Sequence, residues 1–299
     1  MISPAPLRKG DAIGIFCPAR KVTVGDIAPA LDIIKSWGFV PVLGESIGAS
    51  YYQFGGTDTV RAADLQMMLD HSEFKAILCA RGGYGTVRII DRLDFGKFIK
   101  HPKWLIGFSD ATVLHSHIVQ NFGIETLHAS MPLTFASNTT AALQSLYTAI
   151  TGGELSYEWA AHAFDRKGKA EGILVGGNLS LLYSLSGSVS DIDTKGKILF
   201  LEDIDEHYYH FDRMLMQLKR AGKLQHLAGL LIGGLTEMKD KDEDNPFGKT
   251  AEQLVVEHTA EYSYPVAFGF PAGHVDDNRA LIMGRKVQLS VGSKNELHF

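Results

Sequence analysis

The chain of 299 residues carries a formal net charge of −5, and 45% of its residues are hydrophobic. This length can form one large or two medium domains with a sizeable core. Because the charges are interspersed and no basic patch occurs, the composition argues against a nucleic-acid-binding protein. The two cysteines, Cys17 and Cys79, lie in apolar surroundings and are expected to be reduced core residues rather than a disulfide framework.

The N-terminal segment M-I-S-P-A-P-L-R-K-G-D lacks the apolar region of a signal peptide, and no run of 18 apolar residues occurs in the sequence. No internal repeat or low-complexity tract is present. We therefore expect a cytoplasmic protein that has no transmembrane helix and no membrane partner.

The first half of the chain alternates short apolar runs with segments of helical periodicity. The predicted strands are residues 12–17, 39–43, 74–79 and 104–108. The predicted helices are one from the cap Asp26 to Gly38, one from the cap Thr57 to Leu69, and two at residues 86–93 and 110–121. Strands separated by helices in this way predict an α/β domain with a flavodoxin-like parallel sheet and helices on both faces.

The second half is predicted to be a smaller, more β-rich domain. Its predicted strands are residues 197–201, 227–232, 265–270, 280–283 and 286–291, with one clear helix at 211–220. Polar and charged stretches between 134 and 170 indicate a domain boundary. The expected division is a first domain at 1–155, a linker at 156–170 and a second domain at 171–299. The acidic stretch 239–246 is expected to be a solvated loop.

Ser109 lies in the stretch L-I-G-F-S-D-A-T-V-L-H, where a predicted strand gives way to a predicted helix. A serine there is either a helix N-cap or a nucleophile exposed at the carboxyl end of the sheet. Free N–H groups at the start of a helix would stabilise an oxyanion. The corner resembles a nucleophile elbow but departs from G-x-S-x-G, because Ala111 replaces the second glycine.

A glycine-rich turn, A-R-G-G-Y-G at residues 80–85, follows the third predicted strand. Glycine allows positive φ angles and close approach of the backbone to a ligand. The turn could be a phosphate cradle, an oxyanion-hole loop facing Ser109, or only a tight turn. Neither G-x-x-x-x-G-K-[ST] nor G-x-G-x-x-G occurs here, which weakens the phosphate interpretation.

Two further stretches carry candidate catalytic side chains. Glu202 directly follows an apolar strand in L-F-L-E-D-I-D-E-H, where it could orient a histidine or belong to a solvated acidic loop with its neighbours. His274, in the loop G-F-P-A-G-H-V-D-D-N-R, could act as a general base, although most of the twelve histidines are expected to be structural. No H-E-x-x-H motif or Cys/His cluster occurs, so no metal site is predicted.

Several stretches together resemble the LD-carboxypeptidase family, serine peptidases of muropeptide recycling that include the microcin C self-immunity hydrolases. The resemblance covers nearly the whole chain and rests on six motifs in the same order: F-G-G-T-D-T-V-R-A-A-D-L-Q, C-A-R-G-G-Y-G, P-K-W-L-I-G-F-S-D-A-T-V-L-H, G-G-N-L-S-L-L, L-F-L-E-D-I-D-E-H-Y-Y-H-F-D-R-M-L and G-F-P-A-G-H. It implies a flavodoxin-like first domain, a smaller β-rich, swivelling barrel-like second domain, and a site between them.

The resemblance also implies roles for individual residues. The implied triad is Ser109 as nucleophile, His274 as general base and Glu202 as the acid that orients the histidine. The implied oxyanion hole consists of the backbone N–H groups of Asp110 and Gly83. Apart from the resemblance, the candidates for substrate binding are Arg81, Tyr84 and Arg279. Arg81 or Arg279 could bind the terminal carboxylate, because a guanidinium can hold a carboxylate by two hydrogen bonds, but Arg81 could equally form a structural ion pair within the glycine-rich loop.

The function implied is hydrolysis of the L,D amide bond that releases the terminal D-alanine from a muropeptide tetrapeptide, without a cofactor. A homodimer acting on this small peptide is expected from the family. Two alternatives remain open at this stage. The chain could cleave an aminoacyl amide linked to an adenylate-like group, with Trp159 as the candidate for stacking on the base. It could also be a two-domain small-molecule binding protein without catalysis.

Overall fold

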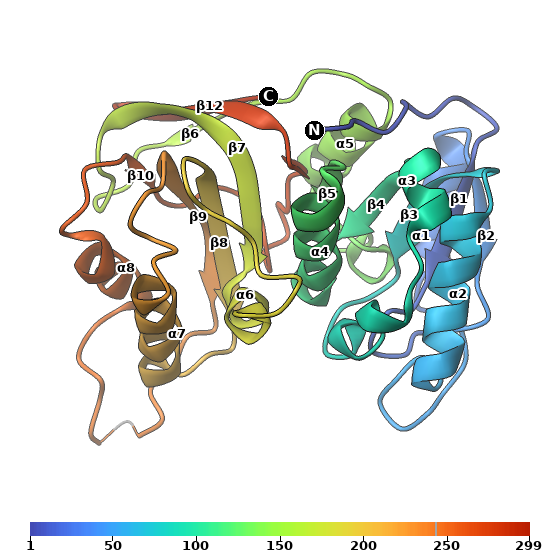
Figure 1. Cartoon of the computed structure of the whole chain (residues 1–299), viewed down its shortest axis with the longest axis horizontal. Helices are drawn as coiled ribbons and strands as arrows, with labels where there is room; N and C mark the ends of the chain where they lie inside the picture. The colour runs from blue at the N-terminus through green and yellow to red at the C-terminus, as the bar shows by residue number, and fades with distance from the viewer. Residues whose placement is uncertain (243) are drawn as a thin grey trace.

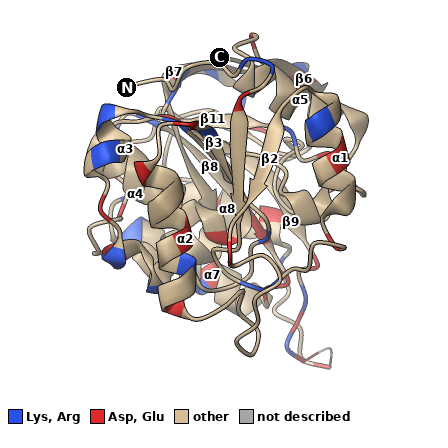
Figure 2. Ribbon diagram, turned by 90° about the vertical axis from the view of Figure 1, so that its right-hand side faces the viewer, with Lys and Arg blue, Asp and Glu red and all other residues tan. Residues whose placement is uncertain are grey.

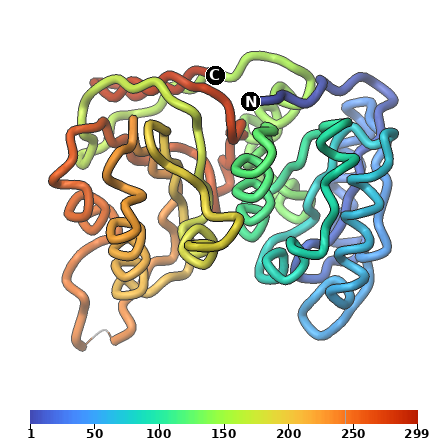
Figure 3. The backbone as a smooth tube through the Cα atoms, viewed as in Figure 1, coloured from blue at the N-terminus to red at the C-terminus, as the bar shows by residue number. Residues whose placement is uncertain are grey.

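Two β-sheets flanked by helices organise the chain into two halves that lie side by side (Figure 1). The computed structural model describes residues 1–242 and 244–299. Both ends of the chain lie at the top of the view, above the junction of the halves (Figure 3). Positive and negative residues are mixed over the side shown in Figure 2, as the interspersed charges of the sequence suggest. No helix in the described residues is long and apolar enough to cross a membrane.

The first sheet has six strands: β1 (Ala12–Phe16), β2 (Val40–Leu43), β3 (Phe74–Cys79), β4 (Trp104–Gly107), β5 (Thr126–His128) and β11 (Leu281–Met283). Its order is β11-β5-β4-β3-β1-β2, and every pair is parallel except β11 with β5. The accompanying helices are α1 (Ala28–Ser36), α2 (Asp58–Asp70), α3 (Gly96–Lys100), α4 (Thr112–Phe122) and α5 (Thr140–Ile150). The predicted parallel α/β arrangement is confirmed.

Helix starts in the first half agree with the sequence at one place and differ at others. Thr57 caps α2 as predicted, because its hydroxyl accepts the Val60 N–H at 3.3 Å. Asp26 does not cap α1; its carboxylate instead accepts the Thr23 N–H at 2.7 Å in the preceding turn. The helix predicted at 86–93 is wrong. Two short 3-10 turns, Thr86–Arg88 and Ile90–Arg92, lie there instead. Hydrogen bonds and ion pairs with Asp110 and with Asp58 of α2 fix this segment.

The second sheet has seven strands: β6 (Ser156–Ala160), β7 (Gly168–Asn178), β8 (Ile198–Ile204), β9 (Gly229–Thr236), β10 (Val266–Ala267), β12 (Lys286–Val291) and β13 (Lys294–His298). Its order is β10-β9-β8-β7-β12-β13-β6, parallel from β10 to β7 and antiparallel from there to β6. Its helices are α6 (Leu179–Leu185), α7 (Tyr208–Arg220) and α8 (Ala251–Thr259). Within the described residues the two outer strands are β10 and β6, and an isolated bridge joins Arg166 to Val266.

Two segments cross the domain division expected from the sequence. Residues 156–160, placed in a linker, form β6 and pair with β13. Strand β11, from the C-terminal part of the chain, pairs with β5 in the first sheet. Helix α4 contacts β7 and α6, so it separates the two sheets while packing against both halves (Figure 1). Packing through α4 therefore joins the half that contains β4 to the half that contains β8, and the candidate residues Ser109 and Glu202 lie near the carboxyl ends of these two strands.

Candidate active site

Ser109 stands at a strained corner between β4 and α4. It opens a 3-10 turn, Ser109–Ala111, with a φ of +59°, a conformation that costs energy in any residue with a side chain. The N-cap position of that turn is Phe108 and the N-cap position of α4 is Ala111. The N-cap interpretation therefore does not account for this serine. A strained strand-to-helix corner that presents a hydroxyl is the geometry of a nucleophile elbow.

The hydroxyl side of this corner faces a cavity of about 580 Å³ lined by both halves of the chain. The first half lines it with Arg20, Arg81, Gly82, Gly83, Tyr84, Phe108, Ser109 and Met131. The second half lines it with Asn178, Ser180, Leu181, Asp203, Ile204, Asp205, Glu206 and His274. Polar groups from several loops thus converge on one concave site, which is the usual setting of an active site.

Glu202 and His274 form a direct pair on the second-half side. Glu202 is fully buried in β8, and its Oε2 lies 2.7 Å from Nδ1 of His274. Gly273 has a φ of +104°, and a Cβ there would stand 2.7 Å from Glu202 Oε2. Only glycine therefore lets the loop cross over the carboxylate. The His274 ring also packs edge-on against Phe108, with 4.9 Å between ring centroids, so its orientation is fixed from two sides.

The surroundings of His274 set its charge. Burial by itself lowers the pKa of the imidazole, but the charge and hydrogen bond of Glu202, with a further contribution from Asp203, outweigh burial and raise the pKa above its ordinary value. Because Nδ1 is held by Glu202, Nε2 is the nitrogen left for proton transfer. Ser109 and His274 line the same cavity without a hydrogen bond between them in the part of the chain described, and such contacts are often long in unliganded enzymes.

The glycine-rich turn passes directly against the nucleophile. A Cβ on Gly82 would lie 3.0 Å from both Cβ and Oγ of Ser109, closer than ordinary side-chain contacts allow. Gly83 has a φ of +113°, and in the described residues its N–H donates to no backbone acceptor. The N–H of Asp110 lies in the first turn after β4, where a helix start leaves such groups free. The turn is therefore more than a tight connection between two elements.

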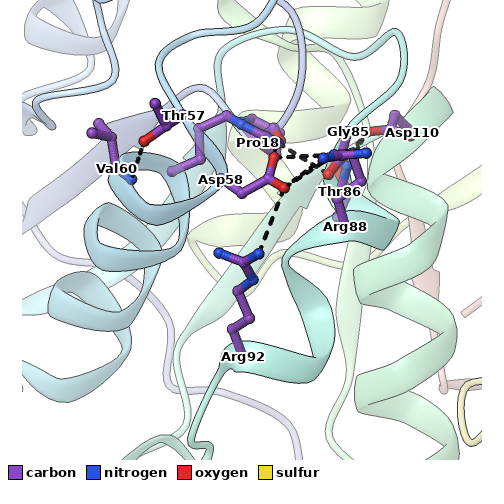
Figure 4. A network of polar contacts seen from close by, with 10 residues as sticks. Pro18, Thr57, Asp58, Val60, Gly85, Thr86, Arg88, Arg92 and Asp110 are labelled. Carbon is purple, nitrogen blue, oxygen red and sulfur yellow. Dashed lines mark hydrogen bonds and ion pairs between the residues drawn. The ribbon is translucent and has the colours of Figure 1, made fainter.

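A polar network behind the turn fastens it to neighbouring loops (Figure 4). The fully buried Arg61 in α2 donates to the carbonyls of Pro18 and Gly85, the latter at 3.0 Å, and forms an ion pair with Asp58. Asp58 in turn binds Arg88 at 2.8 Å. Asp58 and Arg61 belong to the motif F-G-G-T-D-T-V-R, but the sequence analysis assigned neither of them a role. The i, i+3 spacing of an acid and an arginine was the available signal.

Asp110 links the nucleophile corner to the same network through its side chain. Its Oδ2 accepts the Thr86 N–H at 2.8 Å and the Thr86 hydroxyl at 2.5 Å. Burial raises the pKa of this carboxyl, although the Thr86 hydrogen bonds oppose the shift. The sequence assigned Asp110 only through its backbone N–H. The side chain holds the residue after Ser109 against the segment that follows Gly85.

The acidic stretch after Glu202 is not uniformly solvated. Asp203 is buried and accepts from Asn178 Nδ2 at 2.9 Å and from the Ser180 N–H at 3.0 Å. Burial, followed by the nearby Glu202 charge, raises the pKa of Asp203 to about 7. The solvated-loop interpretation fits the exposed Asp205, which pairs with Lys239, but it is wrong for Asp203.

The substrate-binding candidates lie in different places. Arg81 and the half-exposed Tyr84 both line the cavity, whereas Arg279 does not. The Arg279 guanidinium lies 3.0 Å from a carboxylate oxygen of Asp277. The structure also brings in Arg20, which sequence reasoning missed because nothing in its local pattern distinguishes it from a surface arginine.

In the described residues, no group of three or more His, Cys, Asp or Glu side chains is placed so that it could hold a metal ion. His115 illustrates the structural use of histidine. Its Nε2 lies 2.8 Å from the Gly107 carbonyl and its Nδ1 lies 2.9 Å from the Thr126 hydroxyl. Burial lowers the pKa of His115 to about 4, so the ring is neutral and supports the end of β4.

Comparison with known proteins decides the family. Residues 13–129 match the LD-carboxypeptidase N-terminal domain, and residues 171–289 match the LD-carboxypeptidase C-terminal domain. The chain belongs to the LD-carboxypeptidase family. The resemblance inferred from the six sequence motifs is thereby confirmed, and the chain is a hydrolase of a serine peptidase family.

Three proteins similar to this chain illustrate the range of the family. A probable murein peptide carboxypeptidase of Bacillus subtilis is 37% identical, over 97% of this chain and 92% of the relative. The crystal structure of the muramoyltetrapeptide carboxypeptidase from Oxalobacter formigenes superposes with a TM-score of 0.85 at 29% identity, covering 96% of this chain and 98% of that one. A microcin self-immunity protein of Escherichia coli is 25% identical, over 97% of this chain and 94% of the relative.

Proposed function

We propose that this protein is a serine LD-carboxypeptidase that releases the terminal D-alanine from muropeptide tetrapeptides. The observation that carries the proposal is that His274, whose Nδ1 lies 2.7 Å from the buried Glu202, lines the same cavity as the strained Ser109. The names of the Bacillus and Oxalobacter relatives support a murein peptide as substrate.

In the proposed mechanism Ser109 Oγ attacks the carbonyl carbon of the L,D amide bond while Nε2 of His274 takes the hydroxyl proton. Glu202 stabilises the imidazolium and holds the ring in the required tautomer. The tetrahedral intermediate collapses, the C–N bond breaks, and His274 returns the proton to the leaving amine of D-alanine. Water then attacks the acyl ester with the same histidine as base, which regenerates Ser109.

The oxyanion of the tetrahedral intermediate is assigned to the backbone N–H groups of Gly83 and Asp110. The contact of Gly82 with Ser109 supports this assignment, because it places the glycine-rich turn against the attacking oxygen. Backbone donors fixed before the reaction need no reorganisation when the negative charge develops. The Arg61 and Asp110 side chains described above would hold the donors in place.

The biological setting is proposed from the family resemblance. We place the protein in the cytoplasm, where it would act in peptidoglycan recycling as a homodimer. Each chain would consist of two domains that divide near the 156–170 segment. The sedimentation mass of the purified protein measures the oligomeric state directly, and a mass equal to one chain would contradict the dimer.

The test of the proposed function is D-alanine release from a purified tetrapeptide. Wild-type protein is expected to release D-alanine, and Ser109→Ala should lower kcat on the order of 10⁵- to 10⁶-fold. An otherwise identical peptide ending in L-alanine is the matched substrate control. Equal rates for the two peptides, or full activity of Ser109→Ala, would contradict the proposal.

A second candidate function is cleavage of an aminoacyl amide on an adenylate-like group, favoured only by similarity to the microcin self-immunity protein. The aromatic residue considered for base stacking does not support it. Trp159 donates from Nε1 to the Phe268 carbonyl at 2.9 Å and packs on Phe270, and it does not line the cavity. Comparing kcat/KM for the two substrate types separates the candidates. A binding protein without catalysis would hydrolyse neither.

A further inference from the structure

Among the described residues, two arginines of the cavity have no acidic partner. Arg20 and Arg81 both line the cavity that contains Ser109, and neither is ion-paired with a carboxylate within residues 1–242 and 244–299. The Arg81 guanidinium donates to the Lys21 carbonyl at 3.4 Å. By contrast, the three arginines behind the glycine-rich turn are all paired with Asp58. Unpaired guanidinium groups in a concave site are suited to bind an anion in two places.

Arg20 lies close to the nucleophile, with only the glycine-rich turn between them. A Cβ on Gly82 would stand 3.0 Å from Ser109 Oγ, and a Cβ on the next residue, Gly83, would meet Cγ of Arg20 at 2.7 Å. The Arg20 N–H also donates to the Gly82 carbonyl at 3.4 Å. The stem of Arg20 therefore rests on the turn that touches the nucleophile. In a carboxypeptidase substrate the terminal carboxylate lies one residue beyond the scissile carbonyl. The group that binds this carboxylate must therefore lie about one residue's length from the nucleophile.

We propose that Arg20 and Arg81 together bind the terminal carboxylate of the substrate and thereby restrict cleavage to the last residue of the peptide. This inference rests on the proposed function. The two positive charges share one cavity, so an anion between them relieves their repulsion while forming charge-assisted hydrogen bonds. Arg279, which the sequence offered for this task, is engaged by Asp277 outside the cavity lining.

The experiment compares a tetrapeptide ending in a free carboxylate with the same peptide ending in an amide. Wild type, Arg20→Gln and Arg81→Gln are assayed for kcat/KM with both. Arg220→Gln, which changes an exposed arginine on α7, is the matched control. We expect wild type to prefer the free acid, and each cavity variant to lose about ten- to hundredfold of that preference, mainly through KM. Arg220→Gln should retain it. Thermal melting confirms that each variant folds.

The outcomes separate this inference from the proposed function. If wild type hydrolyses the peptide and the variants keep its preference for the free acid, the carboxylate assignment is overturned while the function stands. Equal losses with acid and amide would show that the arginines only brace the glycine-rich turn, which also overturns it. A phosphate-bearing acyl nucleotide that is a better substrate, with the same arginine dependence, would assign the anion as phosphate instead. No hydrolysis of either peptide by wild type would overturn the proposed function and this inference with it.

Discussion

The two halves of the molecule contribute to the cavity by different physical means. Around the nucleophile the first half contributes mainly backbone: the corner at Ser109 with its φ of +59°, and glycines that let a turn pass against it. The second half contributes His274, in a loop that lines the cavity, and behind it the buried Glu202 in β8. A strained backbone must be held by contacts behind it, whereas the attraction within a charged pair is stronger where water is excluded but must offset the cost of burying the charges.

This contrast explains where the supporting residues lie. The first half uses the buried Arg61 and Asp110 to tie three loops together behind the nucleophile. The second half uses a glycine, Gly273, that admits the carboxylate beneath the histidine loop. The four predictions that follow perturb one half or the other, from the largest expected effect to the smallest.

Removing the charge of Glu202 should have the largest effect, because it acts on the proton-transfer step. In Glu202→Gln we expect kcat to fall on the order of 10⁴-fold with little change in KM. Glu202 raises the pKa of His274 and burial lowers it, so the variant should lower this pKa. The histidine then stays neutral to lower pH, and the acid limb of the kcat/KM profile should move to lower pH. Steady-state kinetics across pH measure both effects.

Asp205→Asn is the control for the Glu202 prediction. Asp205 is exposed and has a φ of +59°, which asparagine tolerates, so the change removes one acid without disturbing the backbone. Its loss in kcat should be far smaller. Equal losses in the two variants, or an unmoved acid limb in Glu202→Gln, would refute the role of Glu202 as the orienting acid.

Adding a single methyl group to Gly82 tests the backbone contribution of the first half. The new Cβ would stand 3.0 Å from Ser109 Oγ, so either the hydroxyl or the turn must move. Displacements of this kind cost on the order of 10² in kcat. The control is Gly25→Ala, where a Cβ would meet only the Thr23 hydroxyl at 3.7 Å. Wild-type kcat in Gly82→Ala would show that the turn does not position the reaction.

The polar network around Arg61 and Asp58 should contribute to the free energy of unfolding. Arg61→Met leaves the Pro18 and Gly85 carbonyls without their donor and removes a buried partner of Asp58, which we expect to cost about 3 kcal/mol of unfolding free energy. The control, Arg92→Met, removes a half-exposed ion pair with Asp58 at 3.7 Å and should cost less than about 1 kcal/mol. Urea denaturation measures both, and equal losses would contradict the account.

The smallest effect concerns strain at the nucleophile itself. Ser109→Gly and Ser109→Ala both lack the hydroxyl, but only glycine adopts a φ of +59° without strain. Ser109→Gly should therefore unfold with a free energy about 1 kcal/mol higher than Ser109→Ala. At an unstrained position the order would be reversed, because glycine loses more entropy on folding. Thermal and urea denaturation give the sign directly.

Local patterns predicted much of the fold but little of the site's support. Apolar runs located β3 at its observed bounds and β1, β2 and β4 within one residue, because buried strands need such runs, whereas β5 was missed and β11 was expected in the second domain. The helix predicted at 86–93 failed because Asp110 and Asp58, distant in sequence, determine that segment's conformation. Helix α5 was missed although Thr139 caps it by accepting the Ala142 N–H.

The candidate site divides in the same way. Ser109, Glu202 and His274 could be named because each follows a strand in a distinctive motif. Three other features could not be predicted from the sequence, because each depends on segments that meet only after folding. They are the positive φ of Ser109, the burial of Asp203 and the hydrogen bonds from Arg61 to two carbonyls. Arg20 is the clearest example. Only the structure shows that its stem lies on Gly83.

The central claim is that a serine from one half is activated by a charged pair from the other. Covalent labelling by a serine-reactive phosphonate probe tests it most directly, with the adduct located by peptide mass spectrometry. The account predicts one adduct, on Ser109. Its rate of formation should fall on the order of 10⁴-fold or more in His274→Gln, and neither lowering nor raising the pH should restore that rate. An adduct on another residue, or labelling of Ser109 at the wild-type rate in His274→Gln, would contradict it.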